Sequence, residues 1–173
     1  MNGTAEAGRT RKAWGMSGDR QTGPGPGPGP DLGVLAARVL FSVQRELFAT
    51  LAERGFDDIL PRSGAVLAHL RPEGIRASEL ARLSGQHKQV VGTLVDDLER
   101  LDYVERVPDP ADRRAKLVRP TERGLLQMET AAAIMRAIEE RHAQSLGEET
   151  YAAFKKALGQ VARAQSAAAK RPG

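Results

Sequence analysis

The chain has 173 residues and no cysteine, with a formal net charge of +4 and a pI near 9.8. Its length suffices for one domain of about 140 residues and a tail. The lack of cysteine excludes disulfides, thiolate zinc sites, cysteine nucleophiles and thiol redox sensors. No apolar run approaches the roughly 18 residues of a membrane span, and no apolar stretch of a secretory signal follows the basic N-terminus. We therefore expect a cytoplasmic protein without membrane contact.

Residues 1–30 differ in composition from the rest of the chain. They contain 8 of the 18 glycines and 4 of the 10 prolines, and they end in a Gly-Pro repeat over 23–30. Alternating glycine and proline denies the backbone the donors that helices and sheets need. The sequence therefore predicts a disordered Gly/Pro-rich arm over residues 1–30.

From Asp31 onward the apolar residues recur at helical spacing. Asp31 is placed to cap a helix that Gly55 ends, and Pro61 opens a second helix that stops before Pro72. The pattern then predicts an extended segment over 75–77, a helix over 77–83 and a helix over 87–101. Asp102 follows the last of these, where a left-handed residue commonly ends a helix.

The remainder predicts a hairpin and two long helices. Strands are expected over 103–107 and 115–119, joined by a turn-rich loop over 108–114. Thr121 is placed to cap a helix over 121–145, and Gly147 separates it from a helix over 148–168. The expected apolar face of the first helix is Leu125, Met128, Met135, Ile138 and His142. That of the second is Tyr151, Phe154, Leu158 and Val161, buried in the core or in a dimer interface.

A helix, a break, a helix and a basic hairpin form the order of a winged helix-turn-helix. The helix over 87–101 would be about 22 Å long and fits the major groove of DNA, which is about 12 Å wide. Its first turn would present polar side chains to base edges and phosphates, and Thr93 would lie on the same face of the helix. These candidate DNA-binding residues are Gln86, His87, Lys88, Gln89 and Thr93.

The hairpin carries a local charge of +3 over residues 106–119. An arginine at a hairpin tip can enter the narrow minor groove, where the potential is most negative. Asp112 would not touch DNA, and we expect it to hold the turn and orient an arginine. The candidate DNA-binding residues of the hairpin are Arg113, Arg114 and Lys116.

Two stretches carry a resemblance to a known family. Residues 109–118, reading Asp-Pro-Ala-Asp-Arg-Arg-Ala-Lys-Leu-Val, are followed by Thr-Glu-Arg-Gly at 121–124. Together they resemble the wing of the MarR family of regulators. Residues 94–99 and 103–106 resemble that family's recognition helix and first wing strand. The resemblance extends over roughly residues 32–168. Asp102 and Pro120 depart from it, because the family usually has a glycine and an apolar residue there.

The resemblance implies a mainly α fold with a small β-hairpin wing, in which a winged helix-turn-helix is joined to a helical dimerisation region. It implies an N-terminal dimerisation helix in 31–60, a DNA-binding lobe in 61–120 and C-terminal dimerisation helices in 121–173. It also implies a homodimer that binds a palindromic operator in double-stranded DNA, with Arg114 in the minor groove. A small-molecule effector of unknown identity would release this transcriptional regulator, which we expect to be a repressor.

Other functions find less support in the sequence. The pairs Glu139-Glu140 and Glu148-Glu149 do not face each other on a helix, and no nucleophile and base stand together, so we expect no enzyme and no cofactor. The three histidines lack metal-ligand spacing, and His69 and His142 are expected to be packing residues. The alternative is a winged-helix module that binds protein or RNA without recognising an operator. Steep salt dependence of binding to duplex DNA would separate the two.

Overall fold

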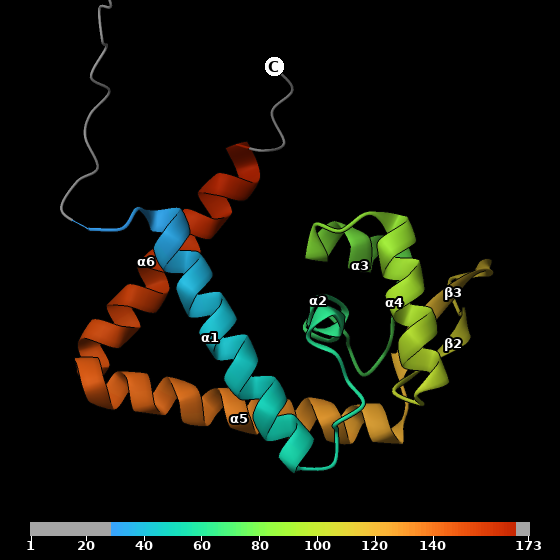
Figure 1. Ribbon diagram of the computed structural model, residues 1–173. Helices are drawn as coiled ribbons and strands as arrows, with labels where there is room; N and C mark the ends of the chain where they lie inside the picture. Colours follow the sequence, from blue (N-terminus) through green and yellow to red (C-terminus); the bar gives the residue numbers. More distant parts are fainter. Residues whose placement is uncertain (1–28, 169–173) are drawn as a thin grey trace, which may run out of the picture.

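The computed structural model describes residues 29–168, so nearly all of the expected arm over 1–30 lies outside the described residues. Figure 1 shows α1, α5 and α6 as the sides of a triangle, with a lobe formed by α2 to β3 beside the first turns of α5. The elements are α1 (Leu32–Glu53), η1 (Pro61–Ser63), α2 (Gly64–Leu67), β1 (Ile75–Arg76), α3 (Ala77–Ser84), α4 (Lys88–Arg100), β2 (Val104–Asp109), β3 (Asp112–Pro120), α5 (Glu122–Leu146) and α6 (Glu148–Ala168). The predicted class, mainly α with a small β wing, is confirmed.

Apart from the helix expected from Pro61, the predicted helix ends agree closely with the structure because their signals are local. Asp31 accepts a hydrogen bond from the Val34 N–H at 2.9 Å, and Thr121 accepts one from the Gly124 N–H at 3.1 Å. Gly85 ends α3 in the left-handed conformation with φ of 67°. Asp102 has φ of 61° and is the one non-glycine residue with positive φ in the stretch 29–168.

The helix expected from Pro61 is shorter than its apolar pattern suggests. It consists of a 3-10 turn, η1, and a single α-helical turn, α2. Beyond α2 the chain closes tighter bonds, with His69 N–H donating to Val66 C=O and Leu70 N–H to Leu67 C=O. Pro72 follows two residues later and cannot continue a helix, so the segment tightens and turns away.

The three strands form an antiparallel sheet in the order β1-β3-β2. The predicted hairpin is present, but its strands are longer than expected and only Pro110 and Ala111 separate them. Pro108 is part of β2, opposite Lys116. Proline is tolerated there because β2 is an edge strand. The loop expected over 108–114 is therefore mostly sheet.

One hydrophobic core joins the lobe to the long helices. It contains Leu51 of α1 and Ile134 and Ile138 of α5 together with apolar side chains of α2, α3, α4, β1, β2 and β3. The expected face of α5 is wrong at Leu125, which is exposed, while Met128 and Met135 are half-buried. The first turns of α5 instead bury Gly124 and Gln127, because that side of the helix meets the turn between α4 and β2.

The apolar faces of α1 and α6 are not buried within one chain. Phe154 is 47% exposed, and Leu158 and Val161 are also exposed, so the expectation of a core position is wrong for these three residues. Leu32, Leu35 and Val39 of α1 are exposed as well. Side chains of α1, α5 and α6 line a largely apolar groove of about 630 Å³ between them. None of the helices within 29–168 is both long and apolar enough to cross a membrane.

Candidate nucleic-acid interface

The first turn of α4 presents a continuous polar surface. The first N–H groups of α4, like those of any helix, have no partner within the helix. The side chain of His87 at the N-cap position forms no capping hydrogen bond with them. Thr93 lies farther along, and its hydroxyl donates to the Gln89 carbonyl at 3.2 Å. All five residues predicted for this helix are exposed: Gln86, His87, Lys88, Gln89 and Thr93. The structure thus brings the first four together at the N-terminal end of α4 and places Thr93 about one helical turn after Gln89.

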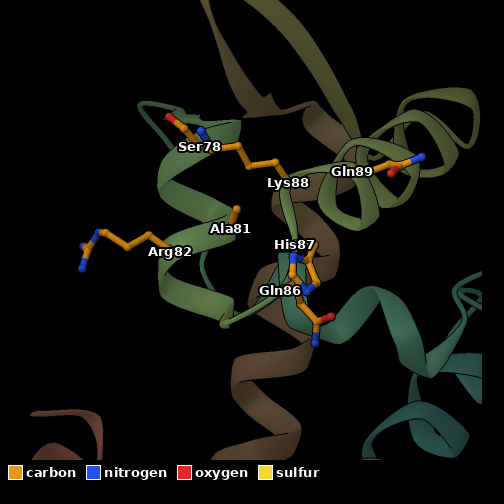
Figure 2. Close-up of a pocket in the computed structure, with 7 residues that line it drawn as sticks. All are labelled: Ser78, Ala81, Arg82, Gln86, His87, Lys88 and Gln89. Atoms are coloured by element: carbon orange, nitrogen blue, oxygen red, sulfur yellow. The ribbon is translucent and has the colours of Figure 1, made fainter. Parts of the chain in front are cut away.

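An open depression of about 620 Å³ lies between α3 and this end of α4. Figure 2 shows Lys88 reaching across it toward Ser78, while Gln89 points to the other side. Arg82 also lines it, and its guanidinium pairs with Glu79 at 2.5 Å. Sequence reasoning missed Ser78 and Arg82 as neighbours of this surface. Their spacing of four residues on α3 was the available signal, because residues four apart share a helix face.

The wing turn is held by two carboxylates and one arginine. Asp109 accepts the Ala111 N–H at 2.8 Å and Arg76 Nε at 2.7 Å. The hydrogen bond from the Ala111 backbone, followed by that from Arg76, lowers the pKa of Asp109 below its usual value. Asp112 accepts the Arg114 N–H at 3.1 Å, and its other oxygen lies 3.7 Å from Arg76. Asp112 therefore contacts the turn as expected, but the carboxylate bound most closely by Arg76 is Asp109.

Residues 106–119 contain five basic side chains, and two of them form ion pairs within the lobe. Arg106 pairs with Asp96 at 2.5 Å and also with Glu99, and Arg119 pairs with Glu105 at 2.8 Å. Arg114 and Lys116 are exposed, and neither forms an ion pair among the side chains that the structure describes. The side chain of Arg113 lies outside that description. Arg114 and Lys116 are thus positioned to meet an anionic partner.

The pairing of Arg106 changes the electrostatics of α4. Asp96 and Glu99 both lie on α4, and their carboxylates would repel phosphates if they were unpaired. Arg106 neutralises both, and its backbone N–H also donates to Glu99 at 3.2 Å. The side chain therefore removes acidic charge beside the polar surface and ties β2 to α4.

The histidines and acids of the described segment do not gather into a metal site. No group of three or more His, Asp or Glu side chains within 29–168 is placed to hold a metal ion. His69 is half-buried, and the half-buried His142 lies with its ring 6.0 Å from that of Tyr151. Both positions fit the packing role that was expected.

The chain is similar to known regulators in sequence and in fold. A family model described as MarR family matches residues 57–115. No curated protein sequence matches the chain. Solved structures do match: CouR from Rhodococcus jostii RHA1 bound to p-coumaroyl-CoA is 29% identical with a TM-score of 0.63, covering 76% of this chain and 92% of that one. A transcriptional repressor CouR bound to a 23-mer DNA duplex is 24% identical with a TM-score of 0.62, at the same coverages.

A regulator from another organism has the same fold. The transcriptional regulator Tm0710 from Thermotoga maritima is 26% identical with a TM-score of 0.52, covering 81% of this chain and 97% of that one. The family match over 57–115 contains α3, α4 and β2, and it ends within β3 at Ala115. It therefore includes every predicted site residue except Lys116.

Proposed function

Because the chain belongs to the MarR family of winged helix-turn-helix regulators, we propose that it represses transcription as a homodimer bound to a palindromic operator in double-stranded DNA. The observation that carries this proposal is the exposed polar start of α4 beside a wing that exposes Arg114 and Lys116. The first can read base edges in the major groove, and an arginine at the wing tip can enter the adjacent minor groove. Gln86, His87, Lys88, Gln89, Thr93, Arg113, Arg114 and Lys116 would be the DNA-binding residues.

The homodimer rests on the exposed apolar faces of α1 and α6. Monomeric proteins rarely expose apolar patches beyond a few hundred Å². The groove between α1, α5 and α6 has an apolar lining that includes Leu35, Tyr151 and Phe154. Helices in 31–60 and 121–173 would therefore pair two subunits, and the lobe in 61–120 would contact DNA. Light scattering should give twice the chain mass of 18.6 kDa, and a monomer would contradict the proposal.

A small molecule would release the repressor. CouR has been captured with p-coumaroyl-CoA and with a DNA duplex, which supports an effector and an operator here without identifying either. A ligand that binds better to a dimer whose recognition helices are wrongly spaced shifts the population away from DNA. Selection of bound fragments from genomic DNA would identify the operator, and its neighbouring genes would indicate the effector's chemical class.

The proposal is tested by Arg114→Ala on the selected operator. The variant should weaken binding to all DNA sequences and reduce the slope of log affinity against log salt by about 1, because one phosphate-region cation is lost. Arg54→Ala is a matched control that also removes one charge, at the C-terminal end of α1. Unchanged affinity of Arg114→Ala in a gel-shift titration would refute the minor-groove role.

The alternative, a module for protein or RNA, predicts different behaviour of the unmodified chain. Operator recognition requires affinity for duplex DNA that falls steeply with ionic strength and depends on sequence. If the purified protein leaves every genomic fragment unbound at low ionic strength, with and without candidate effectors, the regulator assignment fails. The polar surface of α4 would then serve another partner.

A further inference from the structure

Three segments that are distant in sequence meet at the first turn of α5. Asp58 comes from the loop after α1, Tyr103 from the turn between α4 and β2, and Arg123 from α5; we call them the junction cluster. The Tyr103 hydroxyl donates to Asp58 Oδ1 at 2.6 Å, and Arg123 Nη2 donates to both carboxylate oxygens at 3.0 and 3.2 Å. Arg123 Nη1 also donates to the Leu101 carbonyl at 2.7 Å. One guanidinium thus joins the helical region to the end of α4.

The aromatic ring of Tyr103 is the centre of the junction. It is fully buried, the Arg123 guanidinium lies 4.3 Å from its centroid, and the Phe56 ring packs at 6.3 Å. Burial and the hydrogen bond to Asp58 raise the pKa of Tyr103 far above its usual value. Burial alone would raise the pKa of Asp58, but hydrogen bonds from Tyr103 and Arg123 lower it. The cluster is therefore a neutral phenol and a cation around one carboxylate at neutral pH.

Backbone groups of the turn after α4 and of the residue before α5 are also hydrogen-bonded at this junction. Thr121 N–H donates to the Tyr103 carbonyl at 3.1 Å, and the Thr121 hydroxyl donates to the Asp102 carbonyl at 2.5 Å. Gly124 packs against Tyr103 so closely that a Cβ there would overlap its carbonyl oxygen. The start of α5 therefore cannot slide along the turn that follows α4.

A small rotation at this junction has a large effect at the DNA surface. Both DNA-contacting elements leave from Tyr103, since α4 ends at Arg100 and β2 begins at Val104. The 13 residues of α4 span about 20 Å, so a rotation of about 10° moves its first turn by about 3 Å, close to one base-pair rise. Apolar burial is non-directional, whereas hydrogen bonds and ion pairs restrict angles.

We propose that Asp58, Tyr103 and Arg123 are positioning residues, which fix the orientation of α4 and the wing on α5 and thereby the spacing of the two recognition helices. This inference rests on the proposed function, because spacing matters only for a dimer on a two-part operator. Simultaneous binding of two half-sites adds about 10²–10⁴ in affinity and is lost when geometry forbids it. The junction cluster therefore controls avidity and not the contact with a single half-site.

Arg123→Met removes the cation and keeps an unbranched side chain of similar length. Tyr103→Phe is a milder variant that removes only the hydroxyl bound to Asp58, in case Arg123→Met folds poorly. Arg141→Met is the matched control, since Arg141 lies on the same helix and pairs with Glu46 of α1 at 2.7 Å, away from the lobe. Each of the three variants loses one side-chain interaction with a carboxylate: that of Asp58 in Arg123→Met and Tyr103→Phe, and that of Glu46 in Arg141→Met.

The orientation is measured first without DNA. Because the chain has no cysteine, Thr93→Cys on α4 and Ala132→Cys on α5 can carry two spin labels, with excess unlabelled protein so that one subunit of a dimer is labelled. We expect a narrow distance distribution in the parent and with Arg141→Met, and a broader or shifted one with Arg123→Met and Tyr103→Phe. Distributions identical in all four proteins would overturn the proposal.

The effect on DNA is measured with selected duplexes that contain one half-site or two half-sites at varied spacing. Arg123→Met should bind the single half-site like the parent, lose about tenfold or more on the two-part duplex and tolerate a wider range of spacings. Equal losses on both duplexes would show a merely structural role and overturn the proposal. If the distance distribution changes in the variants but the parent binds no DNA, the proposed function fails, and the control of spacing fails with it. If the parent binds DNA but the distance distribution is the same in all four proteins, only the positioning role is refuted.

Discussion

Alanine at position 124 tests the close approach of α5 to the turn after α4. A Cβ built on Gly124 would overlap the Tyr103 carbonyl oxygen and lie 3.1 Å from both the Tyr103 carbonyl carbon and the Pro120 Cβ. The first turn of α5 would have to retreat by about 1.5 Å to restore an ordinary contact of about 3.5 Å with that oxygen. That movement stretches the hydrogen bond from Thr121 N–H to the Tyr103 carbonyl, now 3.1 Å long.

The expected cost follows from these two effects. Overpacking of a rigid site costs about 1–3 kcal/mol, and a weakened backbone hydrogen bond about 1 kcal/mol more. The better helix propensity of alanine returns about 1 kcal/mol. The net loss of about 1–3 kcal/mol should lower the melting temperature of Gly124→Ala by about 2–12 °C for a domain of this size.

The assay is thermal unfolding followed by circular dichroism at one fixed protein concentration, because a dimer melts at a concentration-dependent temperature. Gly92→Ala is the matched control, since Gly92 lies within α4 and a Cβ there would meet nothing within 4 Å. This second alanine should stabilise by up to about 1 kcal/mol. If Gly124→Ala melts at or above the temperature of the parent, the reasoning from the close approach is refuted.

Two further predictions concern base recognition and pH. Gln89→Ala should relax the preference at one or two base pairs by about 1–3 kcal/mol, and an unchanged motif in binding-site selection would count against a base contact. Because the pKa of Asp58 is lower in the folded protein than its ordinary value of 3.8, the ionised Asp58 stabilises the fold at pH values above 3.8. This contribution disappears as the pH falls through the pKa of Asp58 in the folded protein. The stability difference between the parent and Asp58→Asn, measured by denaturant unfolding, should thus be constant over about pH 6–8 and shrink below about pH 4.

Features that depend on a few neighbouring residues could be predicted from the sequence. The caps Asp31 and Thr121 accept hydrogen bonds from N–H groups three residues ahead, and Asp102 adopts the left-handed conformation that its position after a helix indicated. The order of helix, turn, helix and hairpin followed from such signals. The polar start of α4 was predictable too, because exposure there follows from the apolar residues on the opposite face.

The partners of the charged side chains could not be predicted in the same way. Linear counting assigned a local charge of +3 to the wing, but Arg106 pairs with α4 and Arg119 with the neighbouring strand. Arg76 and Asp109 are 33 residues apart and meet only because β1 pairs with β3 beside the wing. The register of a sheet decides these contacts, and composition does not contain it. The cations left for DNA are therefore fewer than the count suggests.

The apolar faces of α1 and α6 show what helical periodicity measures. The pattern identified Phe154 and Leu158 as residues to be removed from water, and a single chain leaves both exposed, together with Leu35 and Val39 on the apolar side of α1. Periodicity indicates which side of a helix must be buried. It does not tell whether that side packs against the same chain or against a second copy of it. The α5 face was assignable only in part: the predicted Ile138 joins the core, but Leu125 is exposed, and the core residue Ile134 was not predicted. The exposed stripes thus support the proposed second subunit, and in such a dimer the junction cluster would hold the two lobes at one spacing.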